Sequence, residues 1–133
     1  MAYSDKDDII ERLSEIELID LASEGATLDS GALAVTATAI DDADREIDSY
    51  VSSRYNVPFS TVPDLIKKIS VELAIVNLNK KRNIFTDDTV ERAKWAKDML
   101  EKLAKGTISL DIDTSGEDFP QRIQFTSDEL RGW

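Results

Sequence analysis

A long helical periodicity, ended by a proline, dominates this sequence. Between residues 30 and 54, apolar side chains recur at intervals of three and four, which places them on one face of an α-helix. Pro58 prevents this helix from continuing, and Pro63 stands near the start of the next, where a missing N–H does no harm. We therefore expect one long helix over residues 30–54, a loop over 56–63 and a second long helix over 64–81.

Capping signals delimit the other helices. Ser4 is expected to cap a first short helix, and Ser14, with Glu17 three residues later, resembles the capping box of a second. Thr86 is expected to cap a third long helix, which Gly106 terminates.

The pattern changes after residue 106. Ile108, Leu110 and Ile112 alternate with polar residues, as in a β-strand, and residues 113–121 are mostly polar. We predict a mainly α fold: a small bundle of about five helices, two short and three long, with a short β-like segment and an extended C-terminal tail. Residues 1–112 would form the helical domain, and residues 113–133 a linker and tail.

One residue interrupts the apolar face of the helix expected over residues 30–54. The stripe comprises Leu33, Ala37, Ile40, Asp44, Ile47 and Val51. In a first interpretation, Asp44 lies at a partly exposed end of the stripe or is paired with Arg45 or Arg54; in a second, it is a polar group that fixes the register of an interface. We favour the first interpretation.

Composition narrows the classes of function. The 133 residues include no cysteine and no histidine, so neither a thiol nor an imidazole can act as nucleophile, general base or metal ligand. The segment 111–116 begins like a calcium loop, but Arg122 stands where that loop needs a bidentate glutamate. We expect no catalytic residue, no metal site and no cofactor, and hence no enzyme.

The net charge of −11 limits the partners. Tight binding of nucleic acid needs clustered lysine and arginine, whereas an acidic surface suits the wall of a passage through which DNA slides without sticking. No signal peptide or membrane span is visible, so we expect no membrane partner.

The helix expected over residues 64–81 is apolar on two sides. One side forms a broad core face, and the other carries Val71, Ile75 and Leu78. Such a helix is either the central helix of the bundle or one that also meets another subunit. We take these three residues as a candidate subunit interface, together with three apolar residues of the tail: Ile123, Phe125 and Trp133.

Three segments of the chain resemble the Mu-like prophage head–tail connector family. They are the end of the first long helix with the proline that follows it, the start of the second, and the last long helix with its glycine stop. The residues that carry the resemblance are Asp48, Tyr50, Arg54, Tyr55, Pro58, Pro63, Trp95 and Gly106.

This resemblance implies a structural virion protein, assembled in the cytoplasm of the bacterial host. Copies would form a ring, a dodecamer, beneath the portal protein, extend the DNA channel and dock a tail or head-closure protein, while DNA passes without specific binding. The alternative is an acidic protein-interaction module, or a DNA mimic that regulates a basic partner.

Overall fold

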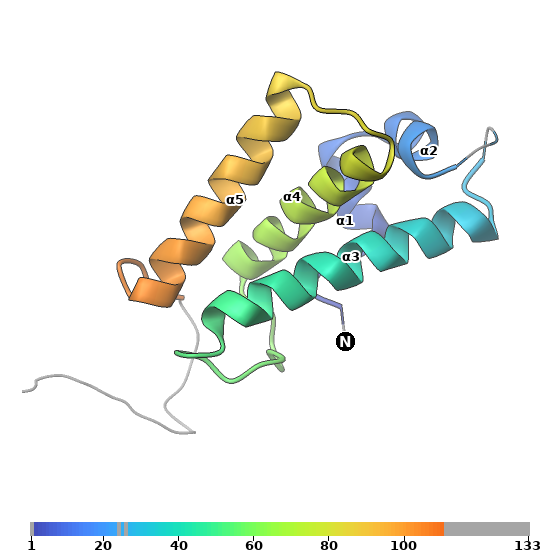
Figure 1. Cartoon of the computed structure of the whole chain (residues 1–133). Coiled ribbons are helices and arrows are strands. Elements are labelled where there is room, and N and C mark those ends of the chain that lie inside the picture. The colour runs from blue at the N-terminus through green and yellow to red at the C-terminus, as the bar shows by residue number, and fades with distance from the viewer. Residues whose placement is uncertain (1, 24, 26, 111–133) are drawn as a thin grey trace, which may run out of the picture.

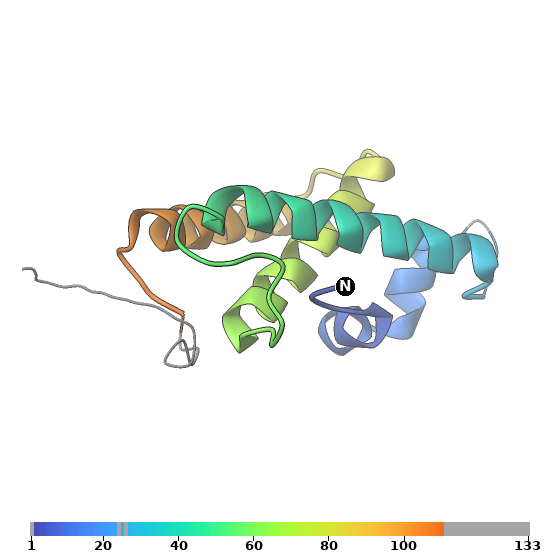
Figure 2. The same cartoon turned by 90° about the horizontal axis from the view of Figure 1, so that it is seen from below.

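The computed structural model describes residues 2–23, 25 and 27–110. This part of the chain forms the expected mainly α bundle, with two short helices and three long ones. They are α1 (Lys6–Arg12), α2 (Glu15–Ala22), α3 (Ser30–Val51), α4 (Asp64–Lys81) and α5 (Asp87–Lys105). Figures 1 and 2 show α4 at the centre, with α3 and α5 against it and the short helices α1 and α2 away from α5.

The central helix α4 is enclosed by the other four helices, each of which contacts it. Eight consecutive residues, 69–76, are buried, so this part of α4 has no side facing water. The assignment of Val71, Ile75 and Leu78 to a subunit interface is therefore wrong: their side chains are at most 3% exposed within one subunit. The second apolar side of α4 packs inside the bundle because α1, α2 and α5 cover what α3 leaves open.

Local signals set most of the helix ends. Ser14, Asp29 and Thr86 cap α2, α3 and α5, each accepting a hydrogen bond from a backbone N–H three residues later. Gly106 ends α5 in the left-handed conformation, with φ of 81°.

The first cap differs from the expectation. Asp5, and not Ser4, caps α1, because Asp5 and Asp8 exchange two backbone-to-carboxylate hydrogen bonds of 3.0 Å each. The Ser4 side chain instead lies inside the protein, with its hydroxyl 2.7 Å from that of Ser70 on α4.

The long helix α3 ends at Val51, three residues before the expected end, and it faces the core in an unexpected register near its start. There, small side chains, Ala32, Thr36, Ala39 and Ala43, are buried, whereas Leu33 and Ala37 are exposed. The core-facing stripe therefore drifts around the helix, as expected for a straight helix with 3.6 residues per turn.

The residues after α5 do not form a strand within the described part of the chain. Residues 108–110 are irregular, although Leu110 is buried against the core as its alternating position suggests. Ile112, the boundary at residue 113 and the proposed tail contacts of Ile123, Phe125 and Trp133 lie outside the described residues. Each helix of the described chain is too short or too polar to span a bilayer.

Candidate functional site

Three aromatic side chains form a cluster at the end of the bundle where α3 ends and the chain leaves α5. Tyr3 packs against Phe59, with ring centroids 5.6 Å apart, and Phe59 packs against Tyr55 at 6.1 Å. The Tyr3 hydroxyl donates to Asp48 at 2.6 Å and accepts from the backbone N–H of Phe59 at 3.3 Å. This aromatic cluster connects the N-terminal segment, α3 and the α3–α4 loop.

The same cluster holds the segment that follows α5. The Tyr55 hydroxyl accepts a hydrogen bond of 3.1 Å from the backbone N–H of Leu110. Nearby, the Arg54 guanidinium lies against Gly106, where a Cβ would approach its Nη1 to 2.5 Å. Glycine therefore serves here both for its left-handed backbone and for the space it leaves. Asp48, Arg54, Tyr55 and Gly106, singled out from the sequence, thus meet at one end of the bundle.

A buried polar network joins the aromatic cluster to α4. Asp44 is only 7% exposed, and its carboxylate accepts from the backbone N–H of Tyr3 at 2.9 Å and from the Ser70 hydroxyl at 2.7 Å. Both sequence-based interpretations of Asp44 are therefore wrong. The side chain is buried and is paired with neither Arg45 nor Arg54, and its two partners belong to the same subunit and not to an interface. Burial raises the pKa of Asp44, and these two hydrogen bonds oppose the rise.

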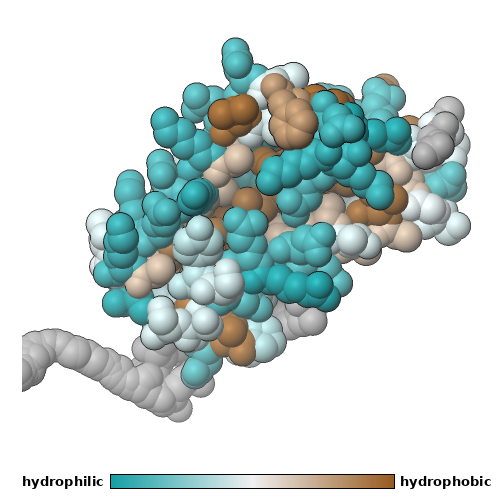
Figure 3. All heavy atoms as spheres, viewed as in Figure 1, coloured by the Kyte–Doolittle hydropathy of each residue, from teal (hydrophilic) through white to brown (hydrophobic). Residues whose placement is uncertain are grey.

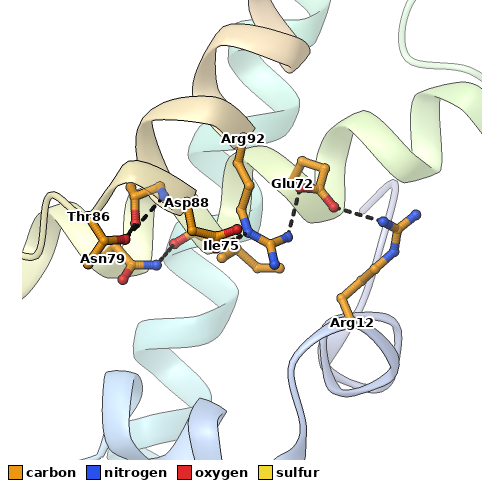
Figure 4. A network of polar contacts seen from close by, with 8 residues as sticks. Arg12, Glu72, Ile75, Asn79, Thr86, Asp88 and Arg92 are labelled. Atoms are coloured by element: carbon orange, nitrogen blue, oxygen red, sulfur yellow. Dashed lines mark hydrogen bonds and ion pairs between the residues drawn. The ribbon is translucent and has the colours of Figure 1, made fainter.

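A second buried group, Glu72, connects three helices. Its carboxylate pairs with Arg12 of α1 at 2.9 Å and with Arg92 of α5 at 2.8 Å, and Arg92 also pairs with Asp88 at 2.9 Å. Figure 4 shows the two guanidinium groups on either side of the Glu72 carboxylate. Sequence reasoning missed this network and had no local signal for it, because the partners lie 60 and 20 positions from Glu72.

The other residues singled out from the sequence have local roles. Tyr50 is half-buried against the core, and Pro58 is exposed after a cis peptide bond. Pro63 occupies the N-cap position of α4. Trp95 is half-buried on α5, and the Lys68 ammonium lies 5.1 Å from its ring centroid, as in a cation–π contact. The structure does not bring these residues into one site.

Among the described residues, no group of three acidic side chains gathers closely enough to hold a metal ion. A shallow depression beside the N-terminal segment is lined by Asp8, Asp64 and Lys67, among others, and Lys67 already pairs with Asp8 at 3.3 Å. The buried carboxylates of Asp44 and Glu72 are likewise bonded within the protein. The arrangement is suited to holding helices and chain segments in fixed positions.

The outer surface is mainly hydrophilic. Figure 3 shows small, separate apolar patches on the face viewed in Figure 1. Among the described residues, the exposed large apolar side chains are Ile16, Leu33, Phe85 and Val90. Phe85 and Val90 occupy the two positions of a hydrophobic staple around the Thr86 cap, N′ and N4.

Comparison with known proteins agrees with the sequence resemblance. The family model described as "Bacteriophage Mu, Gp36" matches residues 3–128 of this chain. Among curated proteins, the chain is similar to the "Mu-like prophage FluMu protein gp36" of Haemophilus influenzae. The two are 32% identical over 117 residues, which cover 86% of this chain and 79% of that protein. The match includes both the aromatic cluster and the helices that carry the buried ion network.

Proposed function

We propose that this chain, which belongs to the bacteriophage Mu Gp36 family of phage and prophage proteins, is a head–tail connector. In this role, copies form a ring beneath the portal, extend the DNA channel and dock a tail or head-closure protein. The family membership carries the proposal, since the match covers nearly the whole described bundle.

The internal construction of the bundle supports a mechanical role. An adaptor must keep its shape while it holds two larger assemblies, and here the aromatic cluster and the Glu72 network join segments that are far apart in the sequence. Polar groups that are fully bonded inside a protein rigidify it. We propose that the chain acts without catalysis, because its buried carboxylates serve structural contacts.

The charge of the chain supports a location beside DNA that must move. With 27 acidic and 16 basic residues, the chain would repel a DNA backbone rather than bind it tightly. We propose that the protein resides in the virion, after assembly in the host cytoplasm, and that DNA passes it without specific contacts.

Deletion of the gene from an inducible prophage tests this proposal. We expect the lysate to contain DNA-filled heads and separate tails, and a copy of the gene supplied in trans should restore joined particles. A tag on the complementing chain should be labelled at the head–tail junction in electron micrographs. Normal yields of tailed, infectious particles from the deletion strain would show that the chain is not a connector.

The acidic N-terminal part of the chain favours a second candidate function. Residues 1–53 contain fourteen acidic and three basic residues, a density of negative charge that also suits a DNA mimic or a module that occupies a basic partner. Such a protein would act outside the particle. Purified virions therefore discriminate the two functions: a connector is present in them at a fixed copy number, and a regulator is absent.

A further inference from the structure

Charge is divided unequally along the chain. Residues 1–53 contain fourteen acidic and three basic residues, a net charge of −11, whereas residues 54–110 contain seven acidic and eleven basic residues, a net charge of +4. The first part forms α1, α2 and α3, and the second forms α4 and α5. Because α4 is buried, most of the positive charge that reaches the surface lies on α5 and at the ends of α4.

Exposed lysines follow α5 from its middle to its C-terminal end. They are Lys94, Lys97, Lys102 and Lys105, and Arg54 joins them because its guanidinium lies against Gly106 at the end of the same helix. None of these five side chains makes an ion pair with another described residue, although the acidic Asp98 and Glu101 lie among them. We call these five residues the basic surface.

The opposite side of the molecule carries negative charge. Glu11 at the end of α1 and Glu15, Glu17 and Asp20 of α2 are exposed, and none of them makes an ion pair within the described residues. Ile16 stands between two of them and is 73% exposed, the highest value among the exposed large apolar side chains. We call Glu11, Glu15, Ile16, Glu17 and Asp20 the acidic surface.

The fold keeps these two surfaces apart. In the described part of the chain, neither α1 nor α2 contacts α5 directly, and α3 and α4 lie between them. Figures 1 and 2, seen from directions at right angles, both place the C-terminal half of α5 on the side of α4 away from α1 and α2. The two surfaces therefore cannot neutralise each other within one subunit.

We propose that the basic surface of one copy binds the acidic surface of a second copy, with Ile16 as an apolar anchor within the contact. The proposal rests on the connector function, and it names the surfaces through which the ring would form. Pairing of unlike surfaces is heterologous, and repeated contacts of this kind close into a ring or continue as a filament. A two-fold pairing of either surface with its own copy would instead place like charges together, which is unfavourable.

Charge reversal on full-length protein tests this contact. One variant carries Lys94→Glu, Lys97→Glu and Lys102→Glu on the basic surface, and a second carries Glu11→Lys, Glu15→Lys and Asp20→Lys on the acidic surface. Sedimentation velocity at low ionic strength should show self-association of the wild type. In each variant the association constant should fall by about tenfold or more, because three attractive pairs become repulsive.

Two further samples distinguish the effect of losing this contact from the effect of changing the net charge. The combined six-residue variant keeps the wild-type net charge and should regain association, and an equimolar mixture of the two three-residue variants should associate where neither does alone. The matched control reverses Asp41, Asp42 and Glu46, which are exposed on α3 and outside both surfaces. Circular dichroism and thermal melting of each variant confirm that the fold is intact.

The outcomes are distinct. Loss in both single-surface variants, recovery in the combination and in the mixture, and an unchanged control support the head-to-tail contact. An equal loss in the α3 control, no recovery on combination, or a wild type that stays monomeric at the highest attainable concentration overturns it. Failure of this contact leaves the particle phenotype of the deletion strain as a separate test of the connector function.

Discussion

Glu72 provides the sharpest test of how this bundle is held together. Its carboxylate side chain is 7% exposed and bonds two guanidinium groups, those of Arg12 and Arg92, which lie on helices at either side of α4. Replacement by glutamine keeps the shape of the side chain and removes the charge. The amide can accept from one arginine only, and its NH₂ group then faces the N–H donors of the other.

The expected cost follows from the exposure of each partner. Arg92 is 20% exposed, so it loses a partner that water replaces poorly, and hydrogen bonds to charged groups contribute about 1.5–3 kcal/mol each. Arg12 is 39% exposed, so water replaces its lost bond at a cost of about 0–1 kcal/mol. We expect Glu72→Gln to lower the free energy of unfolding by about 2–3 kcal/mol, a fall in Tm of about 6–10 °C.

Urea unfolding followed by circular dichroism measures this cost, and a double-mutant cycle assigns it. Arg92→Met and Arg12→Met keep much of the apolar stem of each arginine and remove its charge. The coupling energy of Glu72 with Arg92 should exceed that with Arg12 by about 1 kcal/mol. Glu46→Gln, a carboxylate exposed on α3, is the matched control and should change stability by less than about 0.5 kcal/mol.

Two results would refute this reasoning. If Glu72→Gln behaves like the exposed control, the buried pair contributes no more than a surface pair. If the couplings with Arg12 and Arg92 are equal, the exposure of the partners does not set the cost.

Three further predictions concern the core, the aromatic cluster and the buried carboxylate of Asp44. Ile75→Ala should cost about 2–5 kcal/mol in urea unfolding, because the side chain is 1% exposed; a smaller loss with weaker self-association would instead indicate an interface. Tyr55→Phe should accelerate hydrogen exchange at the Leu110 amide, which loses its acceptor, and cost about 1 kcal/mol; unchanged exchange at that amide would contradict the contact. Burial raises the pKa of Asp44, so its ionisation at neutral pH opposes folding. The stability of the wild type, compared with that of Asp44→Asn, should therefore rise as the pH falls through the raised pKa towards 3.8, the ordinary value. A difference that does not vary with pH would show that the folded-state pKa is ordinary.

The sequence predicts the helices well because their signals are local. Caps such as Ser14 and Thr86 act on backbone groups three residues away, and Gly106 and Pro63 act at their own positions, so a short window contains the information. The bounds of α4 match the expectation for this reason. The first cap was misplaced by one residue because Ser4 and Asp5 are adjacent residues of types that both cap helices.

The long-range contacts could not be predicted in the same way. Asp44 and Glu72 find their partners across 20 to 60 residues, and periodicity identifies a polar residue on an apolar face without naming what it bonds. Similarly, the two apolar sides of α4 predicted that both sides are buried. They did not predict whether the second side packs against helices of the same chain or against a second copy. The aromatic cluster was found only in part, since no spacing rule links Tyr3 to Phe59.

The enclosure of α4 also determines how the protein must unfold. Four helices cover one, so no subset of the bundle retains a closed apolar interior once any long helix departs. We therefore expect a single cooperative unfolding transition. The slowest-exchanging amides of α3, α4 and α5 should all exchange through global unfolding, with the same free energy of opening. A subunit built this way is therefore either wholly native or wholly unfolded, with no partly folded form in between.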